Sequence, residues 1–222
     1  MCSFFSVTLN PEEGAAWRAA ILKDVPLLPN TGAVPGTLTV LGEDARPVLL
    51  SEKGAILLAV GELGAGRVAV FPHDEFINKE KEKGYDKLRE NLCAWLTKSE
   101  GEAPMLSSAK TLNVTTRTSD LEDGMLLKFS MSKSQPTIST GAILDHILSG
   151  GSLLHCICPW SWLQINKGKK LKDMPLYTIL AAAGIYYNDE RGRIPPTGLD
   201  IAKFKAADAH HSLVKLNRVA IK

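Results

Sequence analysis

The chain has 222 residues, of which 45% are hydrophobic and 23% are charged, so it can bury a core as one large or two small globular domains. Its formal net charge of +2, from 26 basic and 24 acidic residues, argues against a broad electrostatic attraction to nucleic acid or to an acidic membrane. No stretch reaches the roughly 18 consecutive apolar residues of a spanning helix, and the N-terminus has no targeting pattern.

The four cysteines stand at positions 2, 93, 156 and 158, far from the dense, regular spacing of a small disulfide-rich secreted domain. Reduced thiols in a cytosolic protein are the simpler interpretation, so we expect a cytoplasmic location. The chain carries no HExxH, CxxC or GxSxG motif. We therefore expect no metal site and no bound cofactor.

The first half of the chain is predicted to form a small antiparallel sheet with packing helices. Residues 11–23 carry apolar residues at helical spacing, and a connector rich in Pro, Gly and Asn follows at residues 25–36. Residues 84–97 place their large apolar side chains on one helical face, which would pack on a sheet of consecutive hairpins. The short β-rich runs that form this sheet cover residues 37–41, 47–50, 55–60 and 67–71.

After a polar linker at residues 99–104, strands and helices are predicted to alternate. The clearest elements are a helix at 139–149, a strand at 153–158, a helix at 175–183 and a strand at 185–187. Weaker patterns predict strands at 112–114 and 125–129 and a helix over 200–217. This order predicts an α/β protein in which the antiparallel β-rich unit is followed by a parallel αβα layer.

The linker suggests two units along the chain. The first is a β-rich unit with packing helices at residues 1–98, and the second is an αβα unit at residues 105–222. The alternative is that both stretches form one composite domain. Gly64-Ala-Gly66 matches part of a dinucleotide fingerprint, but residues 67–71 are β-branched and apolar, so a hairpin turn is the favoured interpretation.

Cys156 and Cys158 lie near the end of the predicted strand at 153–158, which is where glutamine amidotransferases hold a cysteine nucleophile. His155 would point to the opposite side of the strand, and Pro159 offers no backbone N–H for an oxyanion hole. Buried structural thiols are therefore favoured over a nucleophile. If the chain were a cysteine enzyme, its base would have to be a more distant histidine, and the candidates are His73 and His146.

Two further sets of side chains are candidates for contacts with a ligand or partner. His73 precedes Asp74 and Glu75 in a loop after a strand, so it could be a base, a ligand or a residue that ties down the loop, and the last is favoured. Trp160 and Trp162 could stack on a ligand, although packing is the commoner role of tryptophan. Of these residues we keep His73, Glu75, Trp160 and Trp162 as contact candidates.

Several landmarks, in their order and spacing, resemble the N-terminal part of the TRP channel-associated factor family. They are GTLTVLGEDARPVLL from residue 36, GAGRVAV from residue 64, PHDE from residue 72, NLCAWL from residue 91, ILSGGSLL from residue 147 and WSW from residue 160. The resemblance covers roughly residues 11 to 190. No single motif is specific, and the family pattern contains no cysteine at the positions of Cys156 and Cys158.

The resemblance implies a flavodoxin-like or class I glutamine amidotransferase-like αβα fold that has lost amidotransferase chemistry. It also implies a non-catalytic protein-interaction domain in the cytoplasm, peripheral at the plasma membrane, that binds a TRP-type cation channel and regulates its gating or delivery. No nucleic acid partner is expected. The alternatives are a cysteine-dependent hydrolase or amidotransferase-like enzyme, and a carbohydrate-binding accessory module of a metallopeptidase-like protein.

Overall fold

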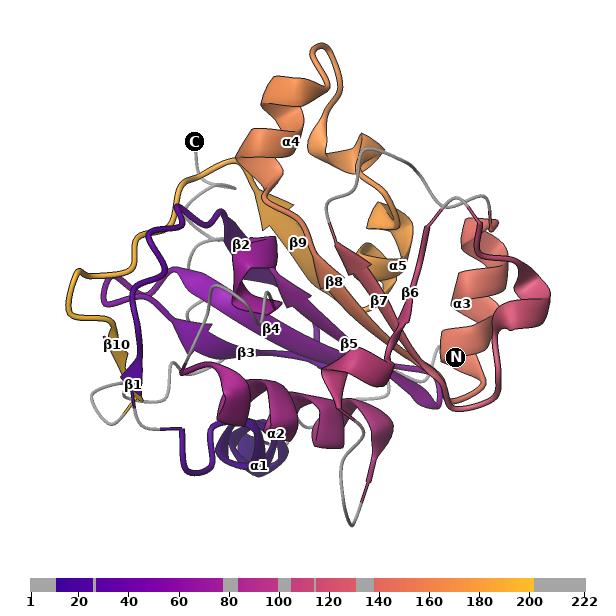
Figure 1. Cartoon of the computed structure of the whole chain (residues 1–222), viewed down its shortest axis with the longest axis horizontal. Helices are drawn as coiled ribbons and strands as arrows, with labels where there is room; N and C mark the ends of the chain where they lie inside the picture. The colour runs from indigo at the N-terminus through magenta and orange to yellow at the C-terminus, as the bar shows by residue number, and fades with distance from the viewer. Residues whose placement is uncertain are drawn as a thin grey trace, which may run out of the picture.

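A computed structural model describes residues 11–25, 27–77, 84–99, 105–113, 115–130 and 138–201 of the chain. Most of the predicted linker and nearly all of the predicted helix over 200–217 lie outside these residues. Within the described residues, a mixed sheet of eight strands carries the fold, and a separate two-stranded pair lies beside it, at the left of Figure 1. That pair joins β1 (Leu27–Leu28) to β10 (Leu199–Asp200).

The eight strands come from both halves of the chain. In order across the sheet they are β6 (Lys110–Thr111), β7 (Leu126–Ser130), β8 (Ser152–Cys156), β5 (Gly66–Phe71), β4 (Ile56–Leu63), β2 (Thr37–Val40) and β9 (Ile185–Asn188), with β3 (Ala45–Leu50) paired to β4. The β6-β7-β8-β5 part is parallel, whereas β5-β4, β4-β2, β2-β9 and β3-β4 are antiparallel. Strands from both predicted units thus lie in one sheet, and the division of the chain into units at residues 1–98 and 105–222 stays a prediction.

Helices cover both faces of the sheet, as Figure 1 shows. One core lies between the sheet and the pair α1 (Pro11–Ile21) and α2 (Asp86–Thr97), and the other lies under α3 (Thr140–Leu148), α4 (Pro159–Ile165) and α5 (Tyr177–Ala182). The part of the chain that the structure describes also contains the short 3-10 helices η1 (Asp74–Ile77), η2 (Leu106–Ser108), η3 (Thr118–Asp120) and η4 (Leu171–Asp173). The predicted α/β class, an antiparallel part followed by a parallel helix-covered part, is confirmed.

Two predicted pairings are wrong. The strand at 185–187 was expected in the parallel layer, but β9 lies at the far edge of the sheet, antiparallel to β2. The reason is the tight turn after α5, where Gly184 adopts a positive φ of 72° and its carbonyl accepts from the Leu41 N–H. This turn directs β9 back along β2. The second error is the hairpin expected between residues 37–41 and 47–50: β2 pairs with β9 and β4, and β3 pairs with β4.

The glycine-rich Gly64-Ala-Gly66 segment is the predicted hairpin turn, since Leu63 pairs with Gly66 between β4 and β5. The turn packs against the end of α3. A Cβ atom at Gly66 would overlap the backbone carbonyl oxygens of Ile147 and Gly151. The close approach of two backbone segments, rather than a nucleotide, accounts for the glycine at position 66.

Candidate functional site

Five chain segments meet at the end of the sheet where the parallel strands finish. β5 and β8 end side by side, with Phe71 opposite Cys156. The β3–β4 turn lies at this same end because β4 is antiparallel to β5. The start of β2 lies here too, since the Gly36 N–H donates to the carbonyl of Pro72, just after β5, at 2.9 Å, and Thr37 pairs with Asn188 at the end of β9. In open α/β sheets, ligands commonly bind outside the carboxyl ends of the strands. A ligand site is therefore expected at this end of the sheet.

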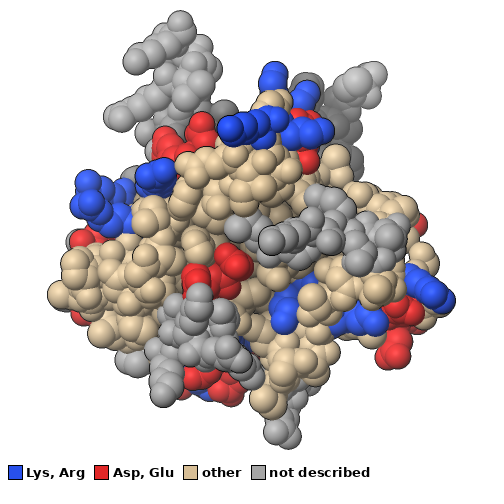
Figure 2. All heavy atoms as spheres, turned by 45° about the horizontal axis from the view of Figure 1, so that its top comes forward, with Lys and Arg blue, Asp and Glu red and all other residues tan. Residues whose placement is uncertain are grey.

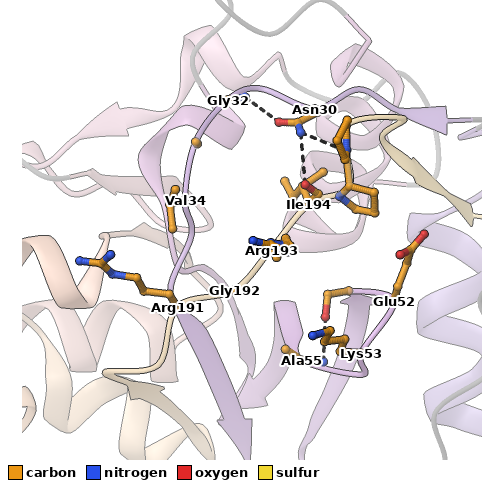
Figure 3. Close-up of a pocket in the computed structure, with 14 residues that line it drawn as sticks. Asn30, Gly32, Val34, Glu52, Lys53, Ala55, Arg191, Gly192, Arg193 and Ile194 are labelled. Atoms are coloured by element: carbon orange, nitrogen blue, oxygen red, sulfur yellow. Dashed lines mark hydrogen bonds between the residues drawn. The ribbon is translucent and has the colours of Figure 1, made fainter.

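A pocket of about 780 Å³ opens at this end, and three segments far apart in the sequence line it. They are the connector before β2 (residues 30–34), the β3–β4 turn (51–55) and the stretch after β9 (191–196) (Figure 3). The volume is in the range of small-ligand pockets. The predicted contact residues are not among those that line it, although Trp160 borders it, as described below.

Asn30 holds two walls of the pocket together. Its Nδ2 donates to the carbonyl oxygens of Ile194 at 3.2 Å and Pro195 at 3.0 Å, and its Oδ1 accepts from the Gly32 N–H at 2.7 Å. One asparagine amide thus uses both of its donors and its acceptor to join segments more than 160 residues apart. The Gly192 N–H adds a further bond to the Pro35 carbonyl, at 2.7 Å.

The charged side chains that line the pocket are mostly basic. The lining contains three basic side chains, Lys53, Arg191 and Arg193, and a single acidic one, Glu52, and all four are exposed. Figure 3 shows Arg193 among the lining residues, whereas Arg191 extends away from Lys53 and Glu52. Planar guanidinium groups suit carboxylates, which they can bind through two parallel hydrogen bonds. The rim is therefore suited to an acidic group.

The two tryptophans of the WSW motif have different environments. Both lie on α4, two residues apart, so their side chains point about 200° apart around the helix. Trp162 is 7% exposed and packs in the core under α3 and α5. Trp160 is half-buried, donates its Nε1–H to the Val34 carbonyl at 2.9 Å, and lies under the Arg191 guanidinium at 4.6 Å. They form no shared stacking platform, and Trp160 alone borders the pocket.

His155 and Cys156 point to opposite faces of β8, as strand alternation predicts. Cys156 belongs to the core under α1 and α2. His155 stacks on Phe129 on the other side, with Nδ1 2.8 Å from the Tyr187 hydroxyl and Nε2 3.1 Å from the Pro175 carbonyl. The carbonyl requires a proton on Nε2, so Nδ1 of the neutral ring accepts from the Tyr187 O–H. His155 thus cannot act on either thiol.

Both thiols at the end of β8 stay protonated near neutral pH. Burial raises the pKa of Cys158 to about 11, and the carboxylate of Asp74 acts in the same direction, against a backbone hydrogen bond at Ser161 and the charge of Arg191. Burial raises the pKa of Cys156 further. Since the thiolate is the nucleophilic form of cysteine, this environment opposes nucleophilic chemistry.

The two histidines considered as a distant base lie at opposite ends of the sheet. His73 follows β5 at the same end as the thiols, and its Nδ1 accepts the Glu75 N–H at 3.1 Å. That nitrogen is also 3.3 Å from Asp74 Oδ1, but while it accepts the N–H it carries no proton, so the contact is not an ion pair. His73 and the half-buried Glu75 thus shape the turn into η1.

His146 lies at the other end of β8. Its Nε2 is 2.9 Å from the Met125 carbonyl, and its ring packs directly on Gly151, which precedes the strand. The four residue steps from Ser152 to Cys156 place this ring about 13 Å or more from the thiols. The structure brings His73 toward the cysteines and keeps His146 away from them.

We expect Cys158 to react slowly with iodoacetamide at neutral pH, because its thiol is both buried and protonated. The labelling rate in the folded chain should rise about tenfold per pH unit without reaching a plateau near the unperturbed value of about 8.5. Peptide mapping by mass spectrometry separates Cys158 from the other cysteines, and labelling in urea supplies the unfolded control. A plateau at or below pH 8.5 in the folded chain would indicate an activated thiolate and contradict this expectation.

The sequence patterns did not reveal the pocket. The strongest local signals near it are Pro29-Asn-Thr-Gly32, which the sequence indicates only as part of a connector, and Arg191-Gly-Arg193, which Ile194 separates from two prolines. Neither segment resembles a site alone, because the pocket forms only when the two lie side by side. Within the described ranges, no group of three or more His, Cys, Asp or Glu side chains is arranged to hold a metal ion. No helix in that part of the chain is long and apolar enough to cross a membrane.

Comparison with known proteins identifies the family. A family model named TCAF_N, described as "TRPM8, N-terminal domain", matches residues 17–193. The chain belongs to this family. Among curated relatives, the TCAF_N chain is 25% identical over 173 residues to a TRPM8 channel-associated factor homolog of Danio rerio and 28% identical over 181 residues to TRPM8 channel-associated factor 2 of Mus musculus. The resemblance to the TRP channel-associated factors is thereby confirmed.

The TCAF_N chain corresponds to only part of these proteins. The two alignments cover 73% and 78% of the chain but 18% and 19% of the relatives, so it spans about a fifth of their length. Among solved structures, the IMPa metallopeptidase from Pseudomonas aeruginosa matches with a TM-score of 0.58 and 13% identity, over 93% of this chain and 25% of that one. The same enzyme in complex with T-antigen matches with a TM-score of 0.56 and 14% identity. At this identity the likeness shows the fold alone.

Proposed function

We propose that this TCAF_N chain is a non-catalytic protein-interaction domain that binds a TRP-type cation channel and regulates its activity or its delivery to the plasma membrane. The observation that carries the proposal is the match of residues 17–193 to the family, whose curated relatives are named TRPM8 channel-associated factors. The chain would act on the cytoplasmic side of the membrane, where Cys93, Cys156 and Cys158 would stay reduced.

The arrangement of the thiols supports a binding role over the alternative of a cysteine enzyme. Both strand-end cysteines have raised pKa values, and two of the three histidines discussed, His155 and His146, are turned or placed away from them. Pro159 follows Cys158 directly and has no N–H to stabilise an oxyanion. The nucleophile, base and oxyanion donor that acyl transfer requires are thus not brought together around these thiols.

We place the channel-binding surface at the pocket rim. Tryptophan and arginine are enriched at the energetic centres of protein interfaces, and here Arg191 stacks on the half-buried ring of Trp160 beside a basic rim. His73 and Glu75 lie at the same end of the sheet and would border the contact. An acidic segment of the partner fits this surface, because its carboxylates would meet Arg191 and Arg193.

We expect the R191A/R193A variant to bind TRPM8 about tenfold or more weakly than the unaltered chain, because two interface arginines are removed. The measurement is capture of detergent-solubilised TRPM8 on the tagged chain, over a range of chain concentrations. The matched control is K23A/K87A, which removes the same charge from the surface near α1 and α2.

Two outcomes have separate meanings. If the unaltered chain captures TRPM8 no better than an unrelated membrane channel, the proposed channel association is wrong. If R191A/R193A and the control bind equally well, association stands but the pocket rim is not the contact surface. Surface biotinylation of TRPM8 in cells with and without the chain then tests regulation of delivery directly.

A further inference from the structure

A second basic surface lies at the turn that follows α4. The segment Asn166-Lys-Gly-Lys-Lys-Leu-Lys-Asp173, here named the lysine turn, contains four lysines within six residues, and all four are exposed. The full chain has a net charge of only +2, so this local concentration is hidden in the overall composition. None of the four ammonium groups forms an ion pair with any residue that the structure describes.

The lysine turn is held in a defined shape by its own hydrogen bonds. Asn166 Nδ2 donates to the Trp162 carbonyl at 2.9 Å, and the Lys169 N–H donates to the Asn166 carbonyl at 3.0 Å. The Asp173 carboxylate accepts the backbone N–H of Lys170 at 2.8 Å, so the acidic group of the turn is bound to the backbone. The lysine side chains are therefore presented to solvent from a scaffold that is already folded.

An exposed apolar side chain stands directly before this turn. Ile165, the last residue of α4, is 71% exposed, whereas Trp162, one turn earlier, is buried in the core. In Figure 1, α4 and the chain that follows it project beyond the end of the sheet, and Figure 2 shows Lys and Arg side chains gathered along the upper rim of this end. A protruding apolar residue beside several unpaired cations is typical of surfaces that bind membranes peripherally.

We propose that the lysine turn and Ile165 dock on an anionic lipid bilayer. The lysines would lie in the headgroup region, where each lysine near an anionic surface strengthens binding about fivefold. Ile165 would enter the boundary between headgroups and acyl chains. A nucleic acid or an acidic polymer offers phosphates or carboxylates to the lysines but no apolar layer to Ile165, so the combination favours a bilayer. This docking is independent of the proposed contact with a channel.

The test is flotation of the purified full chain with lipid vesicles. We expect the chain to float with phosphatidylcholine vesicles that contain phosphatidylserine, and to stay behind with vesicles of phosphatidylcholine alone. Binding should weaken as salt is added, because the Debye length falls from about 10 Å at 0.1 M salt to about 3 Å at 1 M salt. Failure of the unaltered chain to bind phosphatidylserine vesicles at low salt overturns the proposal.

Two variants separate the lysine turn from the overall charge. K167Q/K169Q/K172Q should bind phosphatidylserine vesicles about a hundredfold more weakly, and it leaves Lys170 and the cap at Asp173 in place. K23Q/K87Q/K98Q removes the same charge elsewhere and should keep most of the binding. I165S should lose about tenfold, since it removes the apolar contact without changing charge.

Equal loss in the two triple variants would mean that only net charge matters, and would refute docking through the lysine turn. Unchanged binding of I165S would refute insertion of Ile165 into the bilayer. Retention on heparin or RNA, with no flotation, would assign the lysine turn to an acidic polymer and likewise refute the proposal.

Discussion

Gly66→Ala is expected to destabilise the folded chain by about 3 kcal/mol or more. The added methyl group would overlap the carbonyl oxygens of Ile147 and Gly151, where the β4–β5 turn packs against the end of α3. Both obstacles are backbone atoms, which cannot turn aside as a flexible side chain can. The overlap could be relieved only if the β4–β5 turn moved away from α3. That movement would disturb the first residue pairs between β5 and β8.

Urea unfolding followed by tryptophan fluorescence measures this loss as a lower transition midpoint. The matched control is Gly141→Ala, an exposed position in the first turn of α3 whose added Cβ would meet only the Ser139 Oγ, at 3.9 Å. Because alanine favours the helix over glycine, this control should be neutral or more stable by up to about 1 kcal/mol. Equal stabilities of the two variants would show that the turn and α3 are not in close contact.

The second large effect is a loss of stability in acid that originates at His155. Burial lowers the pKa of this imidazole from 6.5 to about 3 in the folded chain, and the hydrogen bond to the Pro175 carbonyl only partly opposes it. The unfolded chain therefore binds a proton at this site below about pH 6.5, whereas the folded chain does not until about pH 3. The stability contributed by the neutral ring is complete above pH 6.5 and falls as the pH is lowered to 3.

Each pH unit in this interval costs about 1.4 kcal/mol, so about 2 kcal/mol should be lost between pH 6.5 and pH 5. The free energy of unfolding is measured at pH 7 and pH 5 for the unaltered chain and for His155→Gln. The variant will be less stable at both values, because it disturbs the bond to Tyr187 and the stacking on Phe129, but its pH-dependent difference should shrink by about 2 kcal/mol.

Carboxylates also titrate toward pH 5, and their contribution is common to both chains, so it cancels in the comparison. If His155→Gln leaves the difference between pH 7 and pH 5 unchanged, His155 is not the group that resists protonation.

The local elements of the fold followed from sequence patterns. The β-rich run at residues 67–71 and the amphipathic run at 84–97 became β5 and α2, with small shifts at their ends. The opposite orientation of His155 and Cys156 also followed, since successive side chains of a strand alternate. In each case the deciding interactions lie within a few residues along the chain.

The errors concern partners that are distant in the sequence. The strand at 185–187 was recognised as a strand, yet its pairing with β2 depends on Leu41 and Gly184, which lie far apart along the chain. The sequence does not predict the α4 helix, because Pro159-Trp-Ser-Trp162 resembles the end of a strand. This helix is the reason why the side chains of Trp160 and Trp162 point in different directions. A short helix of this kind depends on the core beneath it more than on its own propensity.

The sequence by itself determined the α/β class, the positions of the main strands and helices, the hairpin at Gly64 to Gly66, and the order of motifs that resembles the channel-associated factors. Only the tertiary structure decided that residues 30–34, 51–55 and 191–196 enclose one pocket, and that burial keeps the Cys158 thiol protonated. The physical reason is that periodicity and alternation report the contacts of near neighbours. Cavities, desolvation and shared charge instead depend on segments that only the packed sheet brings together.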